Sequence, residues 1–288
     1  MIWLILSMLC NTLLLLILKG FERYKVNMFP GIVVNYAVAG LLGLTLSNSF
    51  PLVAQVPSSD WWWAPLLMGS LFISIFVLIG RTTVESGVSV ATVANKMSVV
   101  VPVIAAVFLY QEQLQALKIV GILLALGAVY LTTLPAGPQA NKGRGHLLLP
   151  ALVFIGSGII DAFVNHVQKV LVPGNLIPLF ISCSFLTAFV IGSMRLLYQR
   201  SKNQITVSWR DVLGGLVLGI PNYFSIYAIT KALDAQLMDS SALYPLNNMG
   251  IVMLSAVGAF VLFKEKLSVL NWTGILLAML AIGLIAIS

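Results

Sequence analysis

Apolar segments of roughly the length that crosses a bilayer core, about 20 residues in a helix, recur along the whole chain. Only short polar connections separate them. Hydrophobic residues make up 59% of the 288 residues and charged residues 9%, against about 25% charged residues in soluble domains. The sequence therefore predicts an all-α membrane protein.

Charges, prolines and polar clusters divide the chain into ten apolar spans. We expect ten transmembrane helices at residues 2–18, 28–47, 62–83, 87–109, 114–133, 147–170, 176–198, 210–232, 239–262 and 268–287. Residues 137–146 are rich in glycine and polar residues, so we expect a linker there. This linker would separate two halves, 1–136 and 147–288.

An internal repeat supports the same division. A shift of 153 residues lays Glu112 to Leu131 on Glu265 to Leu284 with 10 of 20 positions identical, and also lays Asn95 on Asn248. Each half would hold five helices, and because five is odd, the second half enters the membrane from the opposite side. The sequence thus predicts two inverted five-helix repeats related by an axis in the membrane plane.

The distribution of lysine and arginine predicts the orientation. Connections on one side of the membrane hold 12 of these residues and those on the other side hold 3, with Lys96 inside a span. Because basic residues collect on the cytoplasmic side, we expect both termini outside the cytoplasm of a cell (inner) membrane. We assign the net charge of +7 to this orientation, so no nucleic-acid partner is expected.

The repeated segment has a glutamate followed nine residues later by a glycine, as Glu112 with Gly121 and Glu265 with Gly274, and Pro102 lies in the span at 87–109. With these features the chain resembles the drug/metabolite transporter (DMT) superfamily, in its ten-helix EamA-like branch. The resemblance covers essentially the whole chain. It implies a secondary transporter with a central cavity between the halves, and it names no cargo.

The chain departs from this family in two ways. The residue before each glutamate is often glycine in the family, and here it is Gln111 or Lys264. Many members also keep their termini in the cytoplasm, opposite to the orientation that the basic residues predict. Glu112 and Glu265 lie in connections, where we expect them to cap or lock helix ends.

Lys96 lies near the midplane of its predicted span, where a charge costs about 3 kcal/mol or more. One interpretation is a cationic anchor for a carboxylate or phosphate on the cargo. The alternative is a structural ion pair, with Asp161 as its partner. Desolvation could also lower the pKa of the lysine and make it a proton carrier.

A polar stripe and two proline-containing spans supply the other candidates. Ser157, Asp161, Asn165 and Gln168 recur at helical spacing, matched in the first span by Ser7 and Asn11, and such a stripe faces protein or water, or serves as glue between helices. Tyrosines and asparagines surround Pro221 and Pro245, although aromatic pairs in membrane helices also serve packing. The expected substrate-binding residues are Lys96, Asn95, Asp161, Asn165, Tyr223, Tyr227, Tyr244, Asn247, Asn248 and Asn11.

These features favour a secondary active transporter that exports or exchanges a small polar metabolite, for which an acidic, amino-acid-like molecule is one candidate. Alternatives are an ion-coupled multidrug exporter and, from another class, a membrane-embedded enzyme. The sequence has no H-E-x-x-H helix, paired-aspartate site, G-x-S-x-G turn or nucleotide-binding loop, so we expect no enzyme activity, metal or cofactor. The expected partners are the lipid bilayer, the small-molecule substrate and, as an option, a coupling proton.

Overall fold

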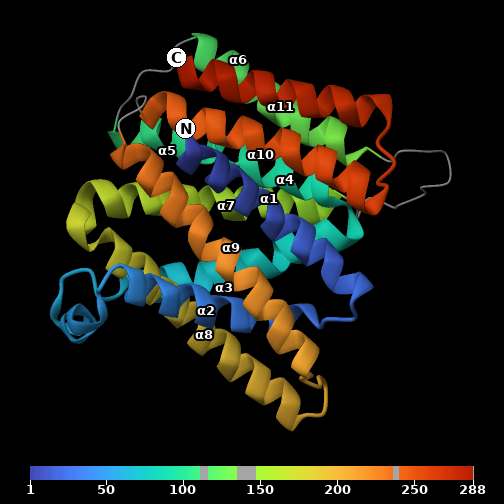
Figure 1. Cartoon of the computed structure of the whole chain (residues 1–288). Coiled ribbons are helices and arrows are strands. Elements are labelled where there is room, and N and C mark those ends of the chain that lie inside the picture. The colour runs from blue at the N-terminus through green and yellow to red at the C-terminus, as the bar shows by residue number, and fades with distance from the viewer. Residues whose placement is uncertain (111–115, 135–146, 236–239, 288) are drawn as a thin grey trace. The chain divides into compact units, whose positions relative to one another are not determined.

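The structure is a computed structural model that describes residues 1–110, 116–134, 147–235 and 240–287 (Figure 1). Every regular element in these ranges is a helix, which confirms the predicted all-α class. The helices are α1 (Ile2–Arg23), α2 (Met28–Leu46), η1 (Phe50–Ser58), α3 (Ala64–Glu85), α4 (Val88–Met97), α5 (Val100–Tyr110), α6 (Ala116–Thr133), α7 (Leu148–His166), η3 (Val167–Leu171), η4 (Gly174–Leu176), α8 (Ile177–Ser201), α9 (Trp209–Asp234), α10 (Ser240–Phe263) and α11 (Val269–Ile287).

Eight helical stretches in the described ranges are long and apolar enough to cross a membrane. Two shorter apolar helices, Ile119–Thr133 and Val269–Ile285, lie in α6 and α11. These helices fit a membrane protein, while the ten spans and the inverted repeat stay predictions. The expected linker at 137–146 lies outside the described residues, as do Gln111 and Glu112.

Packing divides the chain into two compact units. Unit 1 comprises Met1–Lys19, Leu78–Ile159 and Phe224–Ser288, and unit 2 comprises Gly20–Val77 and Ile160–Tyr223. Each unit takes segments from both predicted halves of the sequence. The unit boundaries therefore differ from the predicted repeat boundary, because packing groups helices that are far apart in the chain.

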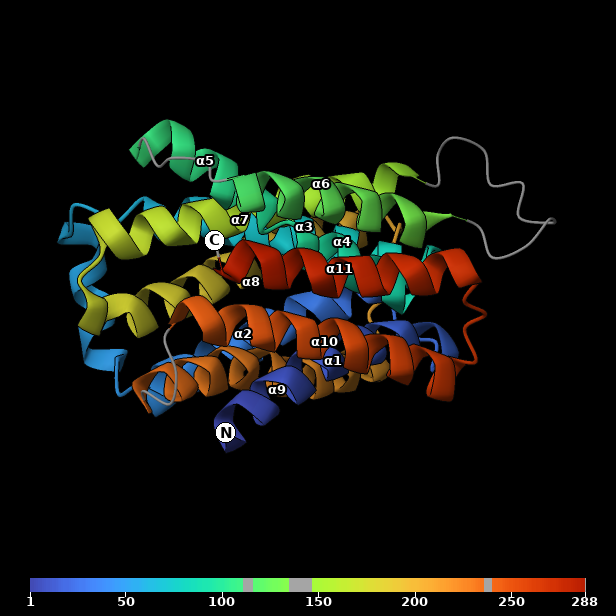
Figure 2. The same ribbon diagram turned by 90° about the horizontal axis from the view of Figure 1, so that it is seen from above.

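In unit 1, α6 and α11 lie side by side (Figure 1, Figure 2). A Cβ atom added at Gly121 would lie 2.7 Å from a side-chain carbon of Ile285, and one at Gly274 would lie 2.9 Å from the backbone nitrogen of Thr132. The start of each helix thus contacts the end of the other, so the two helices are antiparallel. Gly121, Gly274 and four fully buried alanines form a seam of small residues between α6 and α11, and this seam lets the two backbones approach closely. The alanines are Ala125, Ala128, Ala278 and Ala281.

A buried asparagine ties the ends of these two helices together. The Asn271 side chain, 4% exposed, donates from Nδ2 to the carbonyl oxygens of Leu131, Thr132 and Leu134 at 2.9–3.2 Å. Its Oδ1 accepts hydrogen bonds from the backbone and side chain of Ser268. The last carbonyls of α6, which have no partner within their own helix, are thereby bonded.

Unit 2 contains α2 packed on α8 and an aromatic cluster around Tyr36. The Tyr36 hydroxyl donates to the carbonyl oxygen of Phe72 at 2.8 Å. The fully buried Asp211 carboxylate accepts from the backbone N–H of Asn27 at 2.7 Å and of Ser208 at 2.8 Å. Asp211 thus caps the start of α9 and joins it to the start of α2.

Replacing glycines of α6 by a larger residue should lower stability only where the glycine lies in the seam. Replacing Gly121 by valine should destabilise the protein by about 1–3 kcal/mol, because the new side chain overpacks the contact with α11. Gly274→Val should have a similar effect. Gly127→Val is the matched control, because nothing lies within 4 Å of a Cβ atom there. Thermal unfolding of the purified protein in detergent measures these changes, and equal losses in Gly121→Val and Gly127→Val would contradict the seam.

Candidate functional site

The span predicted at 87–109 is interrupted in the structure. α4 ends at Met97 and α5 begins at Val100, so the expectation of one continuous helix was wrong here. Pro102 supplies the physical reason, because proline has no N–H to bond the carbonyl four residues earlier and its ring crowds that carbonyl. The Ser98 carbonyl instead accepts the N–H of Val101 at 2.8 Å.

Lys96 lies in the last turn of α4, directly before this break. It is the ninth residue of the 18-residue candidate span Val88–Ala105, about halfway across. The carbonyl end of a helix favours a cation by about 0.3–1 kcal/mol, which offsets only part of the roughly 2.5–3.5 kcal/mol that a charge costs at the bilayer centre. The half-buried lysine therefore needs polar or aqueous surroundings as well.

Contacts with α7 and a hydrogen bond within the break itself hold this part of unit 1. The Asn95 side chain donates from Nδ2 to the Ser157 hydroxyl at 2.9 Å, and the Asn95 carbonyl accepts from the Ser98 hydroxyl at 2.5 Å. A Cβ atom at Gly158 would come within 3.0 Å of the Ser98 carbonyl oxygen. Gly158 therefore lets α7 cross close to the break, where Asn95, next to Lys96 in the chain, bonds Ser157 of α7.

Two polar residues of α1 contact backbone carbonyls. The buried Ser7 hydroxyl donates to the Ser225 carbonyl oxygen of α9 at 3.1 Å, and Asn11 donates from Nδ2 to the Ser7 carbonyl oxygen at 3.1 Å. Ser7 and Ser157 thus both bond another helix, the alternative role expected for them. A serine at each position joins helices in unit 1.

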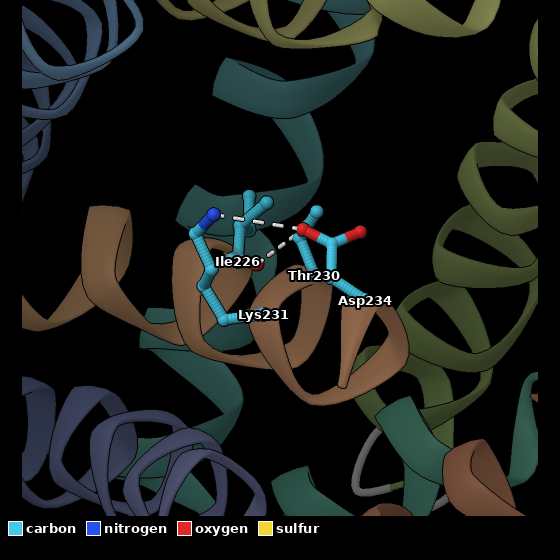
Figure 3. A network of polar contacts seen from close by, with 4 residues as sticks. All are labelled: Ile226, Thr230, Lys231 and Asp234. Atoms are coloured by element: carbon cyan, nitrogen blue, oxygen red, sulfur yellow. Dashed lines mark hydrogen bonds and ion pairs between the residues drawn. The ribbon is translucent and has the colours of Figure 1, made fainter. Parts of the chain in front are cut away.

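Tyr227 of α9 belongs to an aromatic and charged cluster. Its ring centroid lies 6.0 Å from that of Trp3 in an edge-on arrangement, and the Lys231 ammonium lies 5.8 Å from the Tyr227 centroid. The Lys231 ammonium lies 3.6 Å from the Asp234 carboxylate. Figure 3 shows this pair together with the Thr230 hydroxyl, which donates to the Ile226 carbonyl oxygen. An exposed pair of this kind contributes little to stability.

α10 contributes Tyr244, Asn247 and Asn248 around Pro245. It packs against α4 in unit 1. Tyr244 is 44% exposed and Asn248 is half-buried, whereas Asn247 is 5% exposed and its Oδ1 has no hydrogen-bond partner among the described residues. An orphaned buried acceptor costs about 1–3 kcal/mol and points to a water or ligand donor.

The remaining candidates belong to unit 2. Asp161, Asn165 and Gln168 are exposed on one face of α7 and the following π-helical turn η3, whereas Tyr223 is buried. Exposed polar groups inside a candidate membrane span cannot face lipid without a large cost. The expected proximity of Lys96 and Asp161 joins the two units and stays a prediction. The described residues contain no group of three or more metal-ligating side chains.

Comparisons with known proteins give the fold and no activity. No family model matches the chain. A Haemophilus influenzae protein described as "Uncharacterized protein" is 29% identical over 97% of this chain and 95% of its own. A crystal structure of a protein aligns with a TM-score of 0.59 and 14% identity, over 96% of this chain and 97% of that one. The chain shares its fold with that solved structure.

The contact between α4 and α7 predicts coupled mutational effects. Asn95→Ala and Ser157→Ala should each destabilise the protein by about 1 kcal/mol, the size of an interhelical hydrogen bond in a membrane protein. The double variant should lose no more than either single variant, because both remove the same bond. Unfolding in detergent measures the stability of the two single variants and of the double variant. Ser70→Ala is the control, because the exposed Ser70 hydroxyl donates to the Leu66 carbonyl oxygen of its own helix. Additive losses would contradict the direct bond.

Proposed function

We propose that this protein is a secondary active transporter of the DMT superfamily, with a small acidic or amino-acid-like metabolite as its cargo. The observation that carries the proposal is the helix broken midway along a candidate membrane span, with Lys96 in the last turn before the break. Secondary transporters bind substrates and ions at the ends of such discontinuous helices near the bilayer midplane. The protein would sit in the cell (inner) membrane with both termini outside.

The α6–α11 seam supports the inverted repeat. The nearest atoms to a Cβ at Gly121 include those of Ala281 and Ile285, and the nearest to a Cβ at Gly274 include those of Ala128 and Thr132. Adding the repeat shift of 153 to Gly121, Ala128 and Thr132 gives Gly274, Ala281 and Ile285. A twofold axis between the two helices produces this reciprocal pattern, as ten helices in two inverted repeats require.

The chemistry of unit 1 favours an acidic or zwitterionic cargo. The half-buried Lys96 ammonium would pair with a carboxylate, and a charge pair at a partly buried site is stronger than one in bulk water. The unpartnered Asn247 Oδ1 would accept a hydrogen bond from an amino group of the same cargo. Because α4 packs against α10, one small molecule could contact both helices.

The first experiment identifies the cargo and its anchor. Purified protein is screened by thermal shift against amino acids and organic acids, since a ligand that binds the folded state raises the melting temperature. The best ligand is then tested in liposomes by counterflow of its labelled form. We expect an acidic or amino-acid-like ligand that exchanges across the bilayer. Formation of a chemical product, or the absence of any saturable exchange, would reject the transporter.

Lys96→Met should fold like the wild type and lose affinity for this ligand about 10- to 100-fold, the worth of one charged hydrogen bond. Lys231→Met is the matched control, because its ammonium pairs at the exposed end of α9. If Lys96 serves only a structural pair with Asp161, the variant should instead be unstable and regain stability when Asp161 is also removed. Normal binding and exchange by Lys96→Met would contradict the anchor.

A further inference from the structure

Two charged side chains hold the short turn between α3 and α4 in unit 1. The Lys19 ammonium donates to the Val84 carbonyl oxygen at 2.8 Å, and Glu265 Oε1 accepts the backbone N–H of Val88 at 2.9 Å. Lys19 comes from α1, and Glu265 from the connection between α10 and α11. Three parts of the chain therefore meet at this one turn.

The charges match the helix ends that they contact. The last carbonyls of α3 carry partial negative charge and accept from a lysine, while the first N–H groups of α4 carry partial positive charge and donate to a glutamate. Hydrogen bonds with one charged partner are about twice as strong as neutral ones. The expected capping role of Glu265 is confirmed for α4, and Lys19 acts in the same way on α3.

The turn is shaped to admit the carboxylate. Gly87 has φ +108, which residues with side chains rarely adopt, and a Cβ atom there would lie 3.0 Å from Glu265 Oε2. Glu265 follows Lys264, whose φ of 52 lies in the left-handed region that is strained for a non-glycine residue. The glutamate therefore reaches the turn through a backbone held under strain.

A buried hydroxyl next to the turn lacks a hydrogen bond within the described part of the chain. Ser89, 3% exposed in the first turn of α4, has a side-chain oxygen with no partner among the described residues. A serine inside a helix usually bonds the carbonyl four residues earlier, but here that residue is Glu85, the last of α3. Entry of water would bond the Ser89 hydroxyl, and release of Glu265 would relax Lys264. Two charged caps therefore bond a turn that lies next to a buried hydroxyl left unbonded by the described residues.

We propose that Lys19 and Glu265 form a latch that closes the end of unit 1 at the α3–α4 turn and releases it during transport. The latch rests on the proposed function, because alternating access requires each end of the pathway to open in turn. The predicted orientation places this end on the cytoplasmic side. Ser89, directly inside the turn, is the position where opening would first admit water.

The test measures access to position 89 in the full chain reconstituted in liposomes without cargo. A Ser89→Cys reporter is placed in a Cys10→Ala, Cys183→Ala background and labelled with a charged methanethiosulfonate reagent. Glu265→Gln and Lys19→Gln should each speed labelling about tenfold or more, the effect of one lost charge-assisted hydrogen bond. Lys266→Gln is the matched control, because this exposed lysine lies beside Glu265 in the same connection. Unchanged labelling in both latch variants would overturn the proposal.

A second reporter separates latch opening from unfolding. Ala278→Cys lies fully buried in the α6–α11 seam. Its labelling should stay slow in Glu265→Gln and Lys19→Gln, and an equal increase there would overturn the latch in favour of general destabilisation. The two failures are distinguishable: unchanged labelling with intact counterflow rejects the latch alone, whereas faster labelling in a protein without any exchange activity leaves Lys19 and Glu265 as closing contacts and rejects both the transporter and the release of the latch during transport.

Discussion

Hydrocarbon offers no hydrogen bonds, so a chain that crosses a bilayer must pair its backbone N–H and C=O groups internally. A helix meets this constraint within a single segment, and each regular element of the described residues is a helix. It also makes the gap between α4 and α5 informative, since a break inside a candidate membrane span exposes backbone groups that need partners. Polar side chains lie beside the break: Asn95, Ser98, Ser157 and the charged Lys96.

Polar side chains secure the helix ends elsewhere in both units. Asn271 bonds the last carbonyls of α6, and Asp211 bonds the first N–H groups of α9. Lys19 and Glu265 do the same on either side of the α3–α4 turn. Each of these side chains bonds a backbone group that is far from it in the sequence. The caps therefore position helices as well as satisfy backbone groups, while small residues set how closely the helices pack.

The sequence could predict the helices well, because long apolar segments between charges have few other structures available in a membrane. The break at Ser98 was missed although Pro102 was visible. Pro221 and Pro245 lie inside the continuous helices α9 and α10, so a proline alone does not decide between a bend and a break. The close approach of Gly158 to Ser98 distinguishes this site, and no local pattern reveals a contact 60 residues apart.

The sequence allowed us to predict which residue types would form the candidate site, and it did not allow us to predict their contacts or their burial. Lys96 and Asn95 were visible as polar residues in an apolar span, but the bond from Asn95 to Ser157 depends on how α7 crosses α4. Asn247 was expected at the site because of Pro245 beside it. Its unpartnered oxygen appears only once the packing of α10 is known, since burial is a property of the fold.

In the proposed transporter, the Lys96 cation at the broken helix faces a water-filled pathway. The most direct measurement is the reaction of Lys96→Cys, in the background free of native cysteines, with a water-soluble aminoethyl methanethiosulfonate in liposomes. The account predicts that the thiol reacts in the folded protein and that the attached ammonium restores ligand binding. A folded protein whose Lys96→Cys thiol never reacts would contradict the account, because the position would then be sealed from water.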